Sequence, residues 1–168
     1  LVGGALALAG AVMQGVFSNP LADPGIMGVS AGASLGAVIA IALGVTSLGM
    51  FYMPAFAFVG AFVSVGITIL LTWRNNKLDT TTLLLAGVAV SMLLGAFTSG
   101  ILTMINEYRL REFLFWMVGG LDFRRWDHVL LAVGPIVTGS IILMMLGRHL
   151  NVLVLGDTEA RALGLPVM

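Results

Sequence analysis

The sequence predicts an all-α fold, a polytopic transmembrane helical bundle, on two observations. The chain has 168 residues, of which 59% are hydrophobic and only 10% are charged, whereas a soluble domain carries about 25% charged residues. A charged side chain in the hydrocarbon core costs roughly 2.5–3.5 kcal/mol, so a bilayer selects for long uncharged stretches. The charges here do gather in short segments, at Asp23, 74–79, 107–112, 122–127, Arg148 and 157–161.

Five apolar runs are candidates for spanning helices, for which about 20 apolar residues are needed. The first covers 1–17 and the second about 26–45. The third covers 51–73, with Pro54 in its first turn, where a missing N–H costs little. The fourth covers 83–105, and the fifth covers 129–147 with Pro135 as a candidate kink. The chain opens inside an apolar run without Met, so we expect an excerpt of a longer protein.

The connections between these runs carry further predictions. Residues 18–25 read SNPLADPG, and two prolines exclude a continuous helix there. This loop is either a rigid reversal at the membrane surface or an irregular segment that lines a cavity. Residues 109–118 form an amphipathic pattern before two glycines, which predicts a short helix outside the spans. Residues 157–163 predict a short polar helix that ends at Gly164.

Small residues recur at four-residue spacing in three stripes. In lipid, such residues let helix backbones approach closely, so tight packing is the first explanation for each stripe. A stripe that faces a partner or a wet pathway is the alternative, and the 87–103 stripe is the best candidate because three of its members carry hydroxyls. The 28–44 stripe is Gly28, Gly32, Gly36, Ala40 and Gly44, the 60–72 stripe is Gly60, Ser64, Thr68 and Thr72, and the 87–103 stripe is Gly87, Ser91, Gly95, Ser99 and Thr103.

Several kinds of chemistry are excluded by composition. The chain has no cysteine and a formal net charge of zero, which excludes thiolate sites and gives no sign of nucleic-acid binding. Its two histidines, His128 and His149, are too far apart in sequence to suggest a metal site. The uncharged runs hold no ionisable residue, which argues against an ion relay. From the residues alone, a transport permease driven by a partner, a structural anchoring subunit and an ion-coupled secondary transporter remain open, in that order.

Four motifs make the sequence recognisable. Residues 8–36 read LAGAVMQGVFSNPLADPGIMGVSAGASLG, 83–88 read LLLAGV, 115–120 read FWMVGG and 155–165 read LGDTEARALGL. In this order they resemble the iron-chelate (siderophore or haem)/cobalamin family of ABC importer permeases. The resemblance covers nearly the whole chain, with Asn-Pro-Leu-Ala at residues 19–22 as its most characteristic part.

The resemblance implies an architecture and partners. Residues 1–168 would be a partial ABC importer transmembrane domain, roughly the second to sixth spans of a ten-span subunit in the bacterial cytoplasmic (inner) membrane. The subunit would pair with a second permease copy, as a homodimer or pseudodimer, with two ATPase subunits and with a periplasmic or lipid-anchored substrate-binding protein. It would not be an enzyme and would bind no cofactor, because ATP would be hydrolysed in the partner. Residues 74–79 and those from 148 onward would be cytoplasmic, an orientation that the evenly divided Lys and Arg residues do not give.

The resemblance also assigns roles by position. The cytoplasmic gate would comprise Asn19, Leu21, Thr80 and Thr81. The pathway would be lined by Gly87, Ser91, Gly95, Ser99 and Thr103. Coupling to the ATPase would use Asp157, Glu159, Arg161, Leu163 and Gly164. The cargo would be an iron chelate, haem, cobalamin or a similar molecule, which this sequence does not decide.

Overall fold

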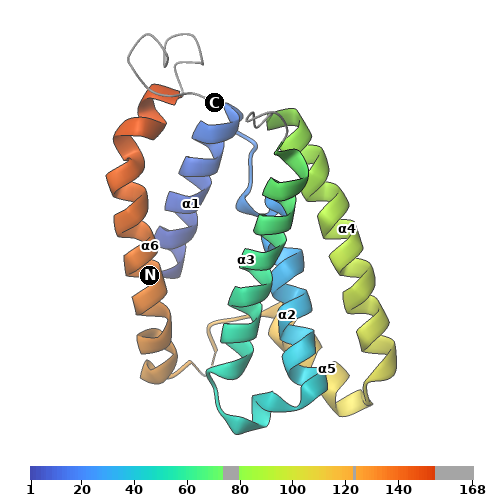
Figure 1. Cartoon of the computed structure of the whole chain (residues 1–168). Coiled ribbons are helices and arrows are strands. Elements are labelled where there is room, and N and C mark those ends of the chain that lie inside the picture. The colour runs from blue at the N-terminus through green and yellow to red at the C-terminus, as the bar shows by residue number, and fades with distance from the viewer. Residues whose placement is uncertain (74–79, 123, 154–168) are drawn as a thin grey trace. The chain divides into compact units, whose positions relative to one another are not determined.

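The computed structural model describes residues 1–73, 80–122 and 124–153, and the regular elements in them are all helical (Figure 1). The predicted all-α class is therefore confirmed for this part of the chain. Two compact units form. Unit 1 combines Leu1–Pro24 with the segment that starts at Asp122, and unit 2 is Gly25–Leu121. The helix expected over 157–163, with its five coupling residues, lies outside the described residues.

Unit 1 pairs α1 (Val2–Phe17) with α6 (Trp126–Leu153). The helix expected over 129–147 extends further at both ends, because helical hydrogen bonding continues into the polar flanks of an apolar run. Pro135 lies inside α6, and the helix continues on both sides of it. At the end of α1, Ser18 takes a left-handed conformation with φ of 46°. The N–H of Asn19 donates to the carbonyl of Gln14 at 3.1 Å, which closes the helix before the proline loop.

Unit 2 is built around α2 (Val29–Leu43), which packs against three other helices. These are α3 (Tyr52–Thr72), α4 (Thr80–Met104) and α5 (Glu107–Val118). Two 3-10 turns flank α2, η1 (Pro24–Met27) before it and η2 (Val45–Leu48) after it. Figure 1 shows α3 and α4 running alongside α2, with the short α5 against the end of α2 that leads into η2.

The expected continuous helix over 26–45 is wrong at its start. The backbone of Gly28 has φ of 82°, a left-handed conformation that separates η1 from α2. Only a glycine takes this conformation readily, and the Pro24 ring has already ended any helix from the preceding loop. The fourth helix also begins three residues before its expected start, at Thr80 rather than position 83.

The helix expected over 109–118 begins two residues earlier because Asn106 caps it. The Asn106 side-chain oxygen accepts a hydrogen bond from the N–H of Arg109 at 3.0 Å. At the other end, Gly119 has φ of 69°, and its N–H donates to the carbonyls of Phe115 and Trp116. The sequence pattern thus gave the right end of α5, and the cap gives its true beginning.

The core of unit 2 lies at the α5 end. Phe113 of α5 is fully buried against Val38 and Ile41 of α2. Six partly buried side chains pack against these three, five from the four helices and Ile105 from the turn between α4 and α5: Leu35, Met53, Ile101, Leu102, Ile105 and Trp116. This cluster fixes α5 against the bundle.

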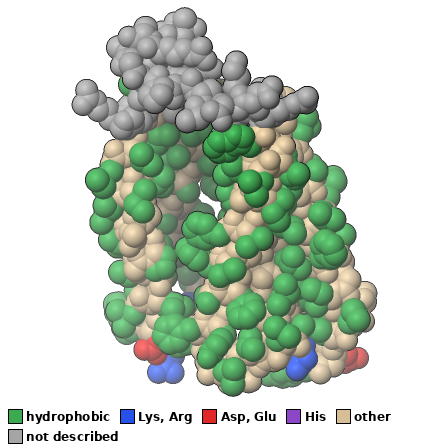
Figure 2. All heavy atoms as spheres, viewed as in Figure 1, with side chains coloured by type: hydrophobic (Ala, Val, Ile, Leu, Met, Phe, Trp, Pro, Cys, Tyr) green, Lys and Arg blue, Asp and Glu red, His purple; other side chains and the backbone are tan. Residues whose placement is uncertain are grey.

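The outer faces of the helices are apolar. Large side chains such as Phe62, Leu70 and Met92 are 62%, 74% and 72% exposed. Soluble proteins rarely expose so many large apolar side chains next to one another. On the face shown in Figure 2, apolar side chains run along the sides of unit 2, and the charged side chains of its described residues lie near its α5 end. Among the residues that the structure describes, three helical segments are long and apolar enough to cross a membrane, Tyr52–Thr72, Thr80–Met104 and Trp126–Gly147, whereas α1 and α2 are shorter. The described chain is therefore a multi-pass membrane protein.

Candidate functional site

The two sides of α2 in unit 2 are packed differently, and one of them forms the candidate site. On the α3 side, the backbones touch. A Cβ added to Gly32 would collide with the backbone of Gly60, and one added to Gly36 would collide with that of Phe56. The 28–44 and 60–72 stripes therefore pack against each other, as the packing explanation predicts.

Hydroxyl groups of α3 complete this interface at the break before α2. The Ser64 hydroxyl donates to the carbonyl of Gly28 at 2.8 Å. The Thr68 hydroxyl lies 3.2 Å from the carbonyl of Met27 and 3.1 Å from that of Ser64. Both side chains are fully buried. Three of the four members of the 60–72 stripe, Gly60, Ser64 and Thr68, therefore contact η1 or α2.

On the α4 side, the 87–103 stripe does not keep one environment. Gly87 is buried against the backbone of Ile26 in η1, with Met27 Cα 3.2 Å from an added Cβ. Ser91 is half-buried, and its hydroxyl donates to the carbonyl of Gly87 at 2.7 Å. Ser99 is exposed, as is Thr103 at the far end. For Gly95, no described atom outside its own helix lies within 4 Å of an added Cβ.

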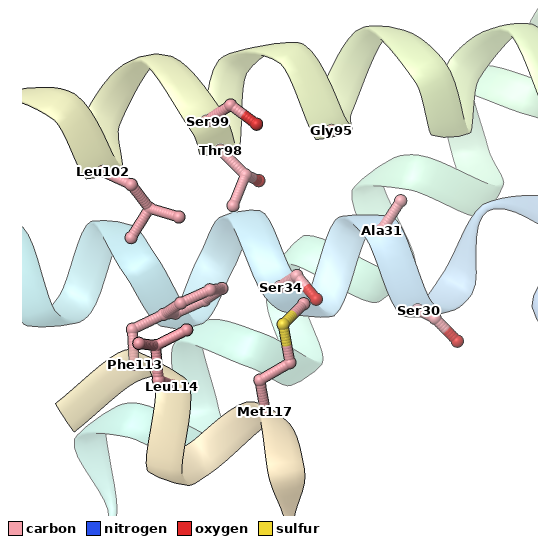
Figure 3. Close-up of a pocket in the computed structure, with 10 residues that line it drawn as sticks. All are labelled: Ser30, Ala31, Ser34, Gly95, Thr98, Ser99, Leu102, Phe113, Leu114 and Met117. Atoms are coloured by element: carbon pink, nitrogen blue, oxygen red, sulfur yellow. The ribbon is translucent and has the colours of Figure 1, made fainter. Parts of the chain in front are cut away.

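Gly95 and Ser99 face a cavity of about 510 Å³ between α2, α4 and α5. Figure 3 shows Thr98 and Leu102 directed from α4 toward α2, with the α5 side chains on the other side of α2. The α2 wall carries small and hydroxyl side chains, and the α5 wall carries large apolar ones. The lining residues are Ser30, Ala31, Ser34, Gly95, Thr98, Ser99, Leu102, Phe113, Leu114 and Met117.

The hydroxyls in this cavity differ from those at the α3 interface. The Thr98 hydroxyl donates to the carbonyl of Leu94 in its own helix at 2.9 Å. Within the described part of the chain, the hydroxyls of Ser30, Ser34 and Ser99 make no hydrogen bond with another protein group. They are therefore available to water or to a polar part of a passing molecule. The cavity combines these groups with an apolar wall, which suits contact with a bulky molecule better than its tight binding.

Of the residues that line this cavity, the sequence analysis named Gly95 and Ser99, as pathway-lining residues, and that role stays a prediction. It named none on the α2 and α5 walls. Ser30 and Ser34 lie one turn apart on α2, next to the 28–44 stripe, and their spacing was a detectable signal. Leu114 and Met117 lie on the short helix that was predicted only as an external segment. Their inward direction depends on Phe113, which anchors α5, and no local pattern gives that rotation.

Arg109 is a second residue whose role the sequence did not show. Its Nη1 donates to the carbonyl of Ala42 at 2.8 Å, in the last turn of α2. A Cβ added to Gly44 would lie 3.1 Å from Arg109 Nη2. The guanidinium thus satisfies a carbonyl at the negative end of the α2 dipole and ties α5 to α2.

The predicted gate residues are divided between the two units. In unit 1, the Asn19 side-chain oxygen accepts a hydrogen bond from the N–H of Leu21 at 2.9 Å. This turn presents Leu21, which is 86% exposed. In unit 2, Thr80 and Thr81 form the exposed first turn of α4. Each pair is thus accessible within its own unit.

The described residues 1–73, 80–122 and 124–153 contain no cluster of three His, Asp or Glu side chains that could hold a metal ion. The described residues form a polytopic helical membrane protein in which α2, α4 and α5 of unit 2 line a partly polar cavity. A proline-rich loop follows α1 in unit 1. The chain belongs to the FecCD transport family, whose model matches residues 1–168. The resemblance that the four sequence motifs indicated is therefore confirmed.

Individual relatives agree with this assignment. The chain is 44% identical over 168 residues to the cobalamin import system permease protein BtuC of Halobacterium salinarum, covering 99% of this chain and 44% of that protein. It is 40% identical over 168 residues to the vitamin B12 import system permease protein BtuC of Citrobacter koseri, covering 99% of this chain and 50% of that protein. The chain thus spans about half the length of the curated relatives it matches.

A solved structure has the same fold. It comes from a protein assigned to the metal-chelate type of ABC transporter, in an inward-facing conformation. The TM-score is 0.87 at 31% sequence identity, and the match covers 99% of this chain and 52% of that one.

Proposed function

We propose that the chain is part of the permease subunit of an ATP-driven importer, and that it forms one part of the translocation pathway for a metal-chelate cargo such as cobalamin. The family match over all 168 residues carries this proposal. Relatives 44% and 40% identical to the chain are cobalamin or vitamin B12 import permeases. The subunit works in the cytoplasmic membrane, and separate ATPase subunits bind and hydrolyse the ATP.

The pathway part of the proposal is supported by the cavity beside α4. Its hydroxyls come from Ser30, Ser34 and Ser99, and its apolar wall comes from Leu114 and Met117. A cavity of about 510 Å³ in this unit alone is too small for a cobalamin-sized cargo. In this proposal the residues that line it therefore form one wall of a larger pathway. A second permease copy supplies the facing wall in this proposal.

In this proposal, the gate and the contacts with partner proteins are assigned by the positions of the residues in the family's motifs. Asn19 and Leu21 narrow the cytoplasmic end of the pathway, together with Thr80 and Thr81 of α4. The segment with Asp157, Glu159, Arg161, Leu163 and Gly164 couples to the ATPase. Outside the membrane, the exposed side of α5, with Tyr108 and Phe115 each 79% exposed, lies near the docking surface of a substrate-binding protein.

Uptake by proteoliposomes tests the proposal. The full-length subunit is reconstituted with its ATPase and binding protein, and labelled cobalamin and a ferric siderophore are offered in turn. We expect uptake of one of them that needs internal ATP and the binding protein. Uptake that follows a proton gradient without ATP would contradict the proposal, and a complex that hydrolyses ATP but moves neither cargo would contradict the cargo class.

A further inference from the structure

The short helix α5 lies antiparallel to α2 in a constant register. The Arg109 side chain donates to the carbonyl of Ala42 at 2.8 Å. One turn further along α5, and one turn back along α2, Phe113 packs against Val38. Positions four residues apart share a face of a helix, so Arg109 and Phe113 define the face of α5 that is turned toward α2. Each step of four residues along α5 therefore matches a step of four residues back along α2.

The next step in this register brings Met117 of α5 opposite Ser34 of α2. Both residues line the cavity of about 510 Å³, and Figure 3 shows the Met117 side chain directed toward Ser34. The register goes no further, because Gly119, with φ of 69°, ends α5. One turn further back on α2, Ser30 also lines the cavity and is exposed. Met117 is therefore the last side chain that α5 places over the α2 wall.

Met117 has more freedom than the other large side chains that line the cavity. Phe113 is 1% exposed and belongs to the core, and Leu102 packs against the same cluster. Leu114 is half-exposed but lies about 100° around α5 from Phe113, away from the middle of the face that is turned toward α2. Met117 is 55% exposed on that face, and its unbranched thioether chain adapts readily to its surroundings. It can thus cover Ser34 or withdraw from it without disturbing the core.

We propose that Met117 is a specificity-determining residue, whose size limits which groups reach the Ser34 hydroxyl and the α2 wall of the cavity. A small group passes the methionine side chain, whereas a bulky group must displace it. None of the described residues that line the cavity is ionisable, so the selection is by size and not by charge. The consequence for cargo, that narrow parts reach the hydroxyls and wide parts are held back, rests on the proposed function.

Thiol labelling of Ser34→Cys measures access to the α2 wall directly. The chain itself has no cysteine, and any cysteine elsewhere in the full-length subunit is replaced by serine. The reconstituted subunit is treated with N-ethylmaleimide or with a maleimide that carries a large fluorophore. We expect Met117→Ala to speed labelling by the bulky reagent about tenfold and Met117→Trp to slow it about tenfold, a steric change of about 1.4 kcal/mol each way. Labelling by N-ethylmaleimide should change much less.

Matched variants in the Ser34→Cys background separate this role from general packing. Met117→Leu keeps a similar side-chain volume, so its labelling rates should stay close to those of the parent. Met92→Ala changes a methionine that is 72% exposed on α4 and does not line the cavity, and it should leave the rates unchanged. The proposal is wrong if Leu114→Ala speeds labelling as much as Met117→Ala, if the Met117 variants label like the parent, or if N-ethylmaleimide does not reach Ser34→Cys. Should Met117→Trp fail to fold, Met117→Ala decides.

Uptake of two corrinoids adds the functional readout. In proteoliposomes with the ATPase and the binding protein, labelled cobalamin is compared with cobinamide, a smaller corrinoid that lacks the nucleotide loop. We expect Met117→Trp to lower the ratio of cobalamin uptake to cobinamide uptake about fivefold, by the same steric cost, while ATP hydrolysis persists. An unchanged ratio beside slowed labelling would contradict the consequence for cargo. A parent complex that takes up neither corrinoid would overturn the cargo in the proposed function instead, and the labelling rates would still decide whether Met117 limits access.

Discussion

Stripes of small residues lie on both α3 and α4, but α2 packs closely against α3 and leaves a cavity beside α4. Facing α3, the 28–44 and 60–72 stripes are in backbone contact, and hydroxyls that face the interface are bonded. Facing α4, the 87–103 stripe begins in the same kind of contact at Gly87 but opens into a cavity by Gly95. A stripe of small residues therefore permits close approach without causing it.

Helix geometry explains much of the difference. A step of four residues turns an α-helix by about 400°, so each member of a stripe lies about 40° beyond the previous one. Among the glycines of the 28–44 stripe, Gly28, Gly32 and Gly36 contact α3, and Gly44 lies against Arg109 instead. The 87–103 stripe has four steps, which turn it by about 160°. Thr103 therefore lies almost opposite Gly87, and the two cannot face one partner.

The largest effect should come from adding a side chain at the α2–α3 contact, where the helix backbones touch. Gly32→Leu places a side chain against the backbone of Gly60, so helices α2 and α3 must separate. Overpacking of this kind costs about 1–3 kcal/mol and more where backbone is the obstacle. We expect loss of folded protein in a detergent melting assay monitored by size-exclusion chromatography. A Gly32→Leu protein that melts like the parent would show that the contact is not structural.

Gly95→Leu is the matched change on the open side. An added Cβ at Gly95 meets no described atom outside α4 within 4 Å, so we expect the fold to persist and melting to shift by less than about 0.5 kcal/mol. The Leu side chain would instead fill part of the cavity. We expect ATP-driven uptake to fall severalfold while the ATPase still co-purifies. Unchanged uptake would remove Gly95 from the proposed pathway.

Arg109→Met tests whether α5 is held as the outer wall of the cavity. It leaves the carbonyl of Ala42 without this donor at the end of α2, and a half-exposed charged hydrogen bond of this kind is worth about 1 kcal/mol. We expect faster amide hydrogen exchange in α5 and no change in α3. Arg111→Met is the control, because that side chain is 74% exposed and pairs with Glu107 only at 4.0 Å. Equal effects from both substitutions would contradict the special role of Arg109.

Asn106→Ala should have the smallest effect. It removes the side-chain cap of α5, which contributes about 1 kcal/mol or less at an exposed site. Hydrogen exchange should quicken only in the first turn of α5, near Arg109, and Asn106→Asp should preserve the parent rates. Faster exchange along the whole helix would mean that the cap, and not the Phe113 contact, fixes α5.

The sequence predicted the helices well because apolar runs and glycine or proline breaks are local signals. It misplaced the start of α2 because nothing in the run Ile26–Met27–Gly28 shows that Gly28 takes a positive φ. The carbonyls at this break bond hydroxyls of Ser64 and Thr68, which lie 36 and 41 residues further along the chain and leave no local signal. Two residues that line the cavity, Gly95 and Ser99, share a stripe that the sequence analysis singled out as pathway-lining, a role that stays a prediction. Leu114 and Met117 reach the cavity only through the tertiary packing of α5.

The shortness of α2 bears on how the chain enters the membrane. Its 15 residues extend about 22 Å, less than the roughly 30 Å hydrocarbon thickness. As an isolated segment emerging from the ribosome, α2 is therefore a weak signal for insertion. The short η2 connection to the longer α3 makes a helical hairpin the natural unit of insertion, in which the Gly32–Gly60 contact forms as the pair enters. Biogenesis would then depend on the same glycines as the finished fold, and substitutions there should reduce the yield of inserted protein before they reduce its stability.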